Sequence, residues 1–543
     1  MIKPNCSALQ RNELITTLKS TNYDLLVIGG GITGAGIALD AALRGLKVAL
    51  IEKNDFAWGT SSRSTKLIHG GLRYLKQLEV GIVMEVGKER AIVYGNAPHI
   101  VVPEKMLLPI IKNGSLGKRS TSLGLMVYDR LAGVKKTERR YMLNKQQTIG
   151  AEPLLNDTIL KGGGMYYEYR SDDARLTIEI IKTAVEEGAL CLNYIKCIDY
   201  LYENEKIVAC KAKDVFTGEE FIINTKKVIN ATGPWVDTLR KKDNSLKGKH
   251  LQLTKGVHIV VPKEKLPIHQ SVYFDVQDGR MIFAIPRQNI VYIGTTDTVY
   301  NQDINEPFAT KEDVEYIIKA TNYMFPTIKL AVDDVISSWS GLRPLIYEEG
   351  KSASELSRKD EIFISDSGLI SIAGGKLTGY RKMAQRVVDV VCKDLAKVEN
   401  RTFKACSTKN QQLSGGNLNG LSIKDFATQL HKDYNQFSTD EIETLIHKYG
   451  CNTNIILDHA IKSQQELLLA EAWYCINYEL SFNINDFYIR RTGRLYFERP
   501  TIEENLEKVH EYFTNTLQTN HTIAEKAKEE FTKAYNLVLA FKN

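Results

Sequence analysis

The chain has 543 residues, 43% of them hydrophobic and 25% charged, a composition typical of a soluble globular protein rather than of a disordered one. This length exceeds one ordinary hydrophobic core and predicts two to four domains. The 71 basic residues outnumber the 65 acidic residues only slightly, and no nucleic-acid-reading motif accompanies them, so we expect no nucleic acid partner.

Apolar runs and cysteines restrict the location of the protein. No apolar run approaches the ~18 residues that a membrane-spanning helix needs. The first twenty residues are polar and lack the apolar core of a secretory signal. The eight cysteines form no C-x-x-C pair and no metal-ligand spacing, which predicts reduced thiols, a cytosolic location and no metal site.

A strand, glycine turn, helix and second strand follow one another over residues 23–52. Gly29 permits the tight turn, Gly31 lets backbone amides approach a pyrophosphate, and Gly34 lets the helix pack close to the strand. Glu52 ends the second strand, where this arrangement places the acceptor for ribose hydroxyls. The unit predicts a dinucleotide site with phosphates at the helix N-terminus, against the plainer alternative of a glycine-rich turn between core strands. The expected cofactor contacts are Gly29, Gly31, Ile32, Thr33, Gly34, Glu52 and Lys53.

Small hydroxyl residues and a glycine pair follow at residues 59–75. Such a segment can wrap a cofactor with backbone and side-chain hydrogen-bond donors, although a serine-rich surface loop would have a similar composition. The expected contacts are Thr60, Ser61, Ser62, Ser64, Lys66, Leu67, His69, Gly70 and Gly71.

The segment from Lys105 to Arg140 holds basic residues interleaved with apolar ones. It contains two acidic residues, Asp129 and Glu138. A basic, apolar segment too short to span a bilayer suits attachment to an anionic membrane surface. The alternative is a solvated basic face over ordinary core residues.

Two further regions predict sheet structure. Short β runs end in Ala231, Thr232 and Gly233, which we expect to extend the nucleotide sheet and to contact the cofactor. Residues 258–297 are strongly β-forming and predict an antiparallel sheet in a second layer. A glycine pair then precedes a helix at 380–398, and from 423 to 539 the pattern is helical. The contacts expected before the 380–398 helix are Gly375, Lys376, Leu377 and Thr378.

Five motifs, taken together, resemble the FAD-dependent glycerol-3-phosphate dehydrogenases, in particular the bacterial aerobic, quinone-linked members. The motifs are G-T-S-S-R-S-T-K-L-I-H-G-G-L-R-Y-L (59–75), K-G-V-H-I-V-V-P (255–262), I-G-T-T-D-T (293–298), G-L-R-P-L (341–345) and G-G-K-L-T-G-Y-R-K (374–382). The resemblance implies FAD, oxidation of sn-glycerol 3-phosphate to dihydroxyacetone phosphate, and a membrane quinone as electron acceptor. It also implies peripheral attachment to the cytoplasmic face of the membrane.

The expected fold is α/β. A Rossmann-like FAD-binding domain is interleaved with an antiparallel-sheet substrate domain and followed by an all-α C-terminal domain. The expected FAD-binding parts are 20–105, 171–250 and 336–405, the membrane-facing or substrate segment is 106–170, the substrate sheet is 251–335, and the helical domain is 406–543.

Oxidation of a secondary alcohol needs a base for the hydroxyl proton and cations for the phosphate. His258 is the preferred base because histidine titrates near neutral pH, while His69 is its rival and is expected to pack on the cofactor. Arg343 and Arg358 are the candidate phosphate clamp. The remaining candidates are Arg73, which would join that clamp or polarise the substrate oxygen, Lys376, which would balance the reduced flavin or touch phosphate, and Tyr74 as a hydrogen-bond donor.

Several alternatives stay open. The related oxidases, which pass electrons to oxygen, carry an extra segment before the G-G-K motif, whereas only seventeen residues separate Arg358 from Lys376 here. No calcium-binding loop follows Ser407, so calcium control is not expected. A non-catalytic flavin-binding protein and an amino-acid oxidase are the other readings. The sequence leaves the oligomeric state undecided, with a homodimer as one candidate.

Overall fold

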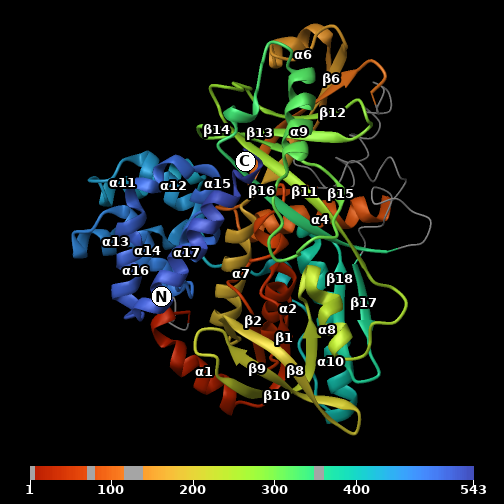
Figure 1. Ribbon diagram of the computed structural model, residues 1–543, viewed down its shortest axis with the longest axis vertical. Coiled ribbons are helices and arrows are strands. Elements are labelled where there is room, and N and C mark those ends of the chain that lie inside the picture. The colour runs from red at the N-terminus through yellow and green to blue at the C-terminus, as the bar shows by residue number, and fades with distance from the viewer. Residues whose placement is uncertain (1–5, 70–79, 115–137, 348–359, 543) are drawn as a thin grey trace.

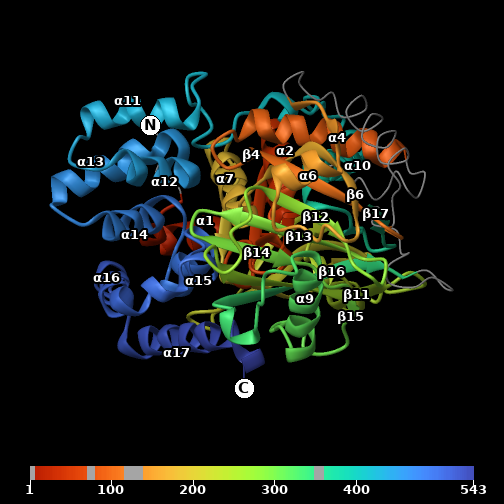
Figure 2. The ribbon, with the colours of Figure 1, turned by 90° about the horizontal axis from the view of Figure 1, so that it is seen from above.

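The computed structural model describes residues 6–69, 80–114, 138–347 and 360–542. Two sheets form the body of the molecule, and the C-terminal helices, drawn in blue, lie along one side of it (Figure 1). The view from above shows the same separation of these helices from the two sheets (Figure 2).

The first sheet is mainly parallel, with the strand order β17-β18-β10-β1-β2-β7. Its strands are β1 (Tyr23–Ile28), β2 (Val48–Glu52), β7 (Leu190–Asn193), β10 (Glu220–Asn230), β17 (Asp360–Ile364) and β18 (Leu369–Gly374). In addition, β9 (Lys206–Asp214) pairs with β10, and β8 (Ile195–Glu203) pairs with β9. Every residue of β1 is buried, as expected for an apolar strand covered on both faces. Helix α2 (Ile32–Leu43) packs against α7 (Asp173–Glu186) and α10 (Tyr380–Glu399).

The second sheet is mainly antiparallel, with the order β15-β11-β14-β13-β12-β4-β6-β3. Its strands are β3 (Leu67–Ile68), β4 (Val102–Ile111), β6 (Leu160–Arg170), β11 (Leu251–Pro262), β12 (Ser271–Asp275), β13 (Met281–Arg287), β14 (Ile290–Gly294) and β15 (Thr298–Val299), with β5 (Tyr141–Asn144) on β6 and β16 (Ser337–Ile346) on β11. Helices α6 (Lys145–Ala151) and α9 (Lys311–Met324) pack against this sheet, in the upper part of Figure 1.

The remaining helices complete the two units and form the C-terminal region. They are α1 (Arg11–Ser20), α4 (Val80–Asn96), α8 (Val236–Lys242), α11 (Ile423–Asp433), α12 (Thr439–Tyr449), α13 (Thr453–Ser463), α14 (Leu467–Tyr478), α15 (Arg494–Phe497), α16 (Leu506–Leu517) and α17 (His521–Leu537). The C-terminal helices have a core of their own around Ile446, Leu457 and Tyr474. A helical domain therefore stands beside the two sheets, as predicted.

Buried charges join the C-terminal helices to the parallel sheet. Asp55, just after β2, accepts hydrogen bonds from Arg490 Nε at 2.5 Å and from Arg491 Nη1 at 2.8 Å. On α7, Arg175 contacts both carboxylate oxygens of Glu479 at 2.8 Å. We call these five residues the interdomain ion cluster; all of them are buried.

This architecture confirms the predicted fold, with a parallel sheet, an antiparallel sheet and a C-terminal helical region. The domain boundaries stay predictions, and β16, which falls within the predicted 336–405 segment, pairs with β11 of the antiparallel sheet. Apolar residues 106–111, expected in a membrane-facing segment, are buried in β4. Within the described residues, no helix is both long and apolar enough to cross a membrane.

Candidate active site

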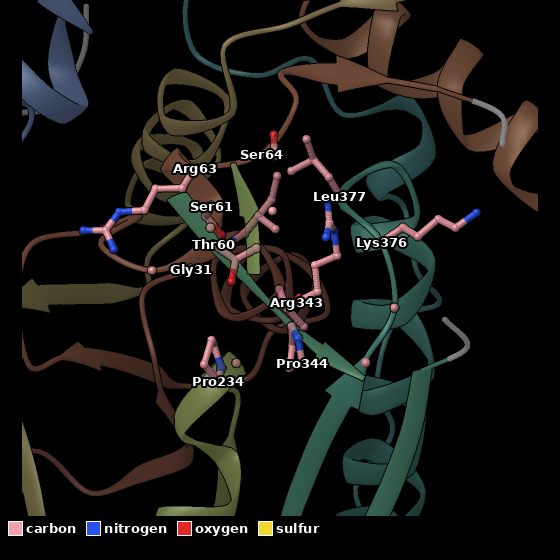
Figure 3. A pocket seen from close by; sticks show the side chains of 18 of the residues that line it. Gly31, Thr60, Ser61, Arg63, Ser64, Pro234, Arg343, Pro344, Lys376 and Leu377 are labelled. Atoms are coloured by element: carbon pink, nitrogen blue, oxygen red, sulfur yellow. Dashed lines mark hydrogen bonds between the residues drawn. The ribbon is translucent and has the colours of Figure 1, made fainter. Parts of the chain in front are cut away.

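A cavity of about 1090 Å³ lies where the two sheets meet. Its walls come from the glycine turn before α2, the segment 58–69, the end of β10, the strands β11 and β16, and the turn between β18 and α10. Figure 3 shows Gly31, Thr60 and Ser61 on one wall, with Lys376 and Leu377 on the opposite wall and Arg343 between them.

The glycine turn is built for close backbone approach. Gly29 has φ of 115°, and a Cβ there would lie 2.5 Å from the Ala231 carbonyl oxygen. A Cβ on Gly34 would lie 1.9 Å from the Gly29 carbonyl oxygen, so only glycine allows α2 to pack this closely. The Ile32 N–H at the start of α2 donates to Ser61 Oγ at 2.9 Å, which attaches the serine-rich segment to the helix end.

Glu52 presents a partly buried carboxylate at this end of the cavity. Its Oε2 accepts from the Gly30 N–H at 2.8 Å, and its Oε1 accepts from the Asn54 N–H at 2.9 Å. Burial raises the pKa of Glu52, while the two backbone donors oppose that shift. A carboxylate oxygen has two lone pairs, so each oxygen can accept a further hydrogen bond from a ligand hydroxyl.

Strands β11 and β16 present the other end of the cavity on one shared face. His258 pairs with Trp339 across the two strands, and their rings stack with centroids 4.8 Å apart. His258 Nε2 lies 3.1 Å from Thr65 Oγ1. Gly294 on β14 faces the same ring, and a Cβ there would lie 2.3 Å from His258 Cδ2. The imidazole therefore has little freedom to move.

Burial and nearby cations keep His258 neutral. Burial lowers its pKa well below the ordinary value, and Arg343 and Lys66 add to that shift. A histidine that is neutral near pH 7 can accept a proton, which is what a general base must do.

Arg343 is held in place by the loop after β14. Its Nη2 donates to Thr295 Oγ1 at 3.0 Å, and its Nη1 contacts Thr296 O at 3.2 Å and Asp297 Oδ1 at 3.1 Å. Its guanidinium crosses Gly256, where a Cβ would lie 2.3 Å from Arg343 Nη2. An orientated guanidinium beside a cavity suits recognition of a phosphate or carboxylate.

The turn between β18 and α10 closes the third side. Gly374 and Gly375 both have positive φ, which side-chain-bearing residues rarely adopt. Lys376 and Thr378 follow and line the cavity, and Thr378 Oγ1 donates to the His69 carbonyl oxygen at 3.2 Å. This hydrogen bond connects the turn after β18 of the parallel sheet to His69, which directly follows β3 of the antiparallel sheet.

Comparison with known proteins agrees with this geometry. A family profile described as "FAD dependent oxidoreductase" matches residues 24–381, and one described as "C-terminal domain of alpha-glycerophosphate oxidase" matches residues 406–522. The chain is 51% identical to the aerobic glycerol-3-phosphate dehydrogenase of Bacillus subtilis, with 99% of this chain and 98% of that one covered. It is 50% identical to the Staphylococcus haemolyticus protein of the same name, covering 98% and 97%.

The chain belongs to the FAD-dependent glycerol-3-phosphate dehydrogenases. Among solved structures, the glycerol-3-phosphate dehydrogenase from Bacillus halodurans, complexed with FAD, matches with a TM-score of 0.83 and 45% identity over 98% of both chains. The alpha-glycerophosphate oxidase from Mycoplasma pneumoniae matches with a TM-score of 0.58 at 17% identity, covering 72% of this chain and 98% of that one, and shares the fold.

The cavity fits the cofactor of this family. The glycine turn and Glu52, predicted to contact the pyrophosphate and the ribose of a dinucleotide, line the same cavity as His258 and Lys376. A Cβ on Gly29 would lie 2.5 Å from Ala231 O and one on Gly375 would lie 2.4 Å from Met383 Sδ, so glycine lets the cavity wall pack closely at both positions.

Most of the predicted site residues meet in this cavity. Those that line it are Gly29, Gly31, Ile32, Thr33, Glu52, Lys53, Thr60, Ser61, Ser64, Leu67, His69, Ala231, Thr232, Gly233, His258, Arg343, Gly375, Lys376, Leu377 and Thr378. Gly70, Gly71, Arg73, Tyr74 and Arg358 lie outside the described residues.

Three predicted contacts do not line the cavity. Gly34 faces β1 instead, in the packing role that its spacing predicts. Ser62 is buried, and its hydroxyl lies 3.4 Å from Gly59 O. Lys66 is buried, and its ammonium contacts Asp173 at 2.5 Å. Although burial disfavours the Lys66 ammonium, Asp173 and Asp172 raise its pKa above the ordinary value.

Sequence reasoning missed several residues of the wall. Thr65 lies beside the His258 ring, and Trp58 and Trp235 line the cavity. Asp297 lies within the quoted I-G-T-T-D-T motif, so its motif was visible although its contact with Arg343 was not. Among the described residues, no group of three or more histidine, cysteine or acidic side chains is placed to hold a metal ion.

Proposed function

We propose that this chain oxidises sn-glycerol 3-phosphate to dihydroxyacetone phosphate and passes the electrons to a membrane quinone. The observation that carries the proposal is the meeting of His258 and Arg343 in one cavity with the glycine turn and Glu52. A base, an anion-binding cation and a dinucleotide site are the three components that this oxidation needs.

Arg343 and Lys376 are the proposed binding groups for the substrate phosphate. Arg343 is orientated by Asp297 and the two threonines before it, so little side-chain entropy is lost when it binds an anion. The side chain of Arg343 is 21% exposed, which leaves it reachable from the cavity. Fixing the phosphate would decide which of the hydroxyl-bearing carbons of the substrate is placed to react.

His258 is the proposed base. FAD, when bound, supplies the acceptor for the hydride that leaves the substrate carbon. The imidazole takes the hydroxyl proton, while Arg343 and Lys376 hold the phosphate and so position the reacting hydroxyl. The Thr65 hydroxyl contacts Nε2 of the imidazole, and the Trp339 ring stacks on its face. The base therefore does not need to reorganise during the reaction.

Anaerobic titration tests the activity directly. Purified holoenzyme should lose its yellow flavin absorbance when glycerol 3-phosphate is added without oxygen. Rapid reoxidation by a quinone analogue and slow reoxidation by oxygen support the dehydrogenase. The reverse order would identify an oxidase, and an unchanged spectrum would indicate a non-catalytic flavin-binding protein.

A substitution series tests the base. His258→Ala should slow flavin reduction by a factor of about 10² to 10⁴ while FAD stays bound, because the proton then has no acceptor. Thr65→Val should have a smaller effect, since it removes one hydrogen bond to the ring. Unchanged single-turnover reduction in His258→Ala would exclude His258, and His69→Ala then tests the rival.

Peripheral attachment to the cytoplasmic face of the membrane is part of this proposal. Residues 106–111 are buried, so attachment has to rely on basic side chains such as Lys112, which is exposed, and on the adjoining residues 115–137, which lie outside the described part of the chain. Flotation with anionic vesicles at low salt should recover the protein. Failure to float would exclude an electrostatic attachment, and size-exclusion chromatography tests for a homodimer.

A further inference from the structure

A loop from the antiparallel sheet reaches across to the parallel-sheet wall of the cavity. Residues 300–310 connect β15 to α9, and Ile304 and Asn305 in this loop line the cavity. The loop meets the other wall near Glu52, which is the ribose end in this family, whereas His258 and Arg343 lie at the reacting end. No residue of this loop was expected to contact the cofactor.

Asn305 joins the loop to that wall through its side-chain amide. Its Oδ1 accepts from Trp235 Nε1 at 3.1 Å and from Lys53 Nζ at 3.3 Å. Its Nδ2 donates to Asp303 Oδ1 at 2.8 Å, and its backbone N–H donates to the same oxygen at 2.9 Å. Asp303 therefore sets the orientation of the amide, with the oxygen toward the two donors.

Both donors are themselves part of the cofactor wall. Lys53 directly follows Glu52, and its ammonium lies 4.3 Å from the centre of the Trp235 ring. The Trp235 ring covers Gly59, where a Cβ would lie 3.0 Å from Cζ3. Burial lowers the pKa of Lys53 because it disfavours the charged ammonium. The partial negative charge of Asn305 Oδ1 stabilises that ammonium.

We propose that Asn305, Lys53 and Trp235 form a latch that closes the cavity at its ribose end and controls how fast FAD leaves. The inference rests on the FAD-linked function proposed above. The latch is formed between two separate structural units, so release of a long dinucleotide from between them requires these contacts to open.

The other contacts that hold the loop lie near its two ends and can stay intact while its tip opens. Tyr300 N–H donates to Leu253 O at 2.9 Å, and Lys255 Nζ contacts Phe308 O at 3.3 Å, so both ends of the loop are fixed to β11. Glu306 contacts Lys533 of α17 at 2.6 Å, but both side chains are about half exposed, and exposed ion pairs contribute little. The two bonds to Asn305 are also exposed, but they join the tip to the parallel-sheet wall of the cavity, so opening the tip has to break them.

Release of FAD from the holoenzyme tests the latch. Holoenzyme is diluted, and the rise in flavin fluorescence gives the rate of FAD release. Asn305→Ala should release FAD about tenfold faster, because two hydrogen bonds are lost. Asn301→Ala is the matched control, since Asn301 is an exposed asparagine of the same loop that does not line the cavity. It should release FAD at the parental rate.

Trp235→Phe provides a second variant that keeps a six-membered aromatic ring and removes the indole N–H that donates to Asn305. It should release FAD about threefold faster, and the double variant with Asn305→Ala no faster than about tenfold, because both changes remove the same bond. Equal release rates in Asn305→Ala and Asn301→Ala would overturn the latch. A double variant that releases FAD about thirtyfold faster would also overturn the latch, because the two substitutions would then act independently. Purified protein that cannot bind FAD at all would instead overturn the cofactor assignment.

Discussion

Two glycines decide whether the reacting side chains can occupy their positions. Gly256 and Gly294 lie beneath Arg343 and His258, and a single added carbon at either would fall 2.3 Å from the neighbouring side chain. Both belong to quoted family motifs, yet a motif alone does not say that a glycine is there to make room for a ring on the adjacent strand. Only the pairing of β11 with β14 and β16 reveals that.

Gly294→Ala should therefore slow flavin reduction by a factor of about 100 by displacing the His258 ring, while FAD stays bound. Stopped-flow reduction at saturating glycerol 3-phosphate measures this rate. Gly150→Ala in α6 is the control, because a Cβ there meets no atom within 4 Å. A normal rate in Gly294→Ala would mean that the ring position does not limit the chemistry.

The pH dependence of reduction should follow the depressed pKa of His258. Because the base stays neutral below pH 6.5, its protonation should cause no loss of rate between pH 8 and about 6.5. Single-turnover rates at saturating substrate test this, since they report the enzyme–substrate complex. A loss of rate with a midpoint above pH 6.5 that disappears in His258→Ala would contradict the assignment.

At the scale of elements, the segment 59–69 shows where sequence reasoning succeeds and where it stops. Its small hydroxyl residues predict contacts with a cofactor, which stay a prediction, and Thr60, Ser61 and Ser64 line the cavity. The pattern could not tell that Lys66 pairs with Asp173 and does not line the cavity, since a loop has no regular period to indicate which side chains share a face. The same limit explains Asn305, whose partners on the opposite wall, Trp235 and Lys53, lie 70 and 252 residues away.

Lys66 and Asp173 should anchor this segment to α7. The Lys66 side chain is 3% exposed and Asp173 is fully buried, so Lys66→Met would leave a buried carboxylate without its cation. We expect a loss of about 3 to 5 kcal/mol in the free energy of unfolding, measured by urea denaturation. Lys211→Met breaks an exposed pair with Glu220 and should change it by less than about 1 kcal/mol. Equal effects would argue against the anchor.

At the scale of the whole molecule, the interface between the helical region and the parallel sheet is polar as well as apolar. His99 is completely buried beside Gly415 and Gly450, within the influence of Arg175 and Lys182. Burial first, and then these two cations, lower the pKa of His99 well below its ordinary value. The sequence predicted a separate helical domain correctly but could not predict this interface, because its partners are far apart in the chain.

Stability should therefore fall as the pH drops below about 6.5. The unfolded chain binds protons on His99 and His258 near that pH, whereas the folded chain does not, so acid favours unfolding. Asp486 opposes this trend: burial, followed by the influence of Asp55, raises its pKa to about 6. Unfolding free energies at pH 7.5 and 5.5 measure the balance. His99→Leu should reduce the difference, and an unchanged difference would exclude His99 as a source.

Asp55 lies three residues after Glu52, yet its arginine partners Arg490 and Arg491 are 435 and 436 residues further along the chain. A ribosome adding about 5 to 20 residues per second needs roughly 20 to 90 seconds to reach them. Until then, the Asp55 carboxylate, which is buried in the folded protein and lies close to the predicted ribose contact Glu52, has no counter-charge. Nascent chains should therefore acquire their flavin only when synthesis is nearly finished, and truncated chains should emerge from translation without it.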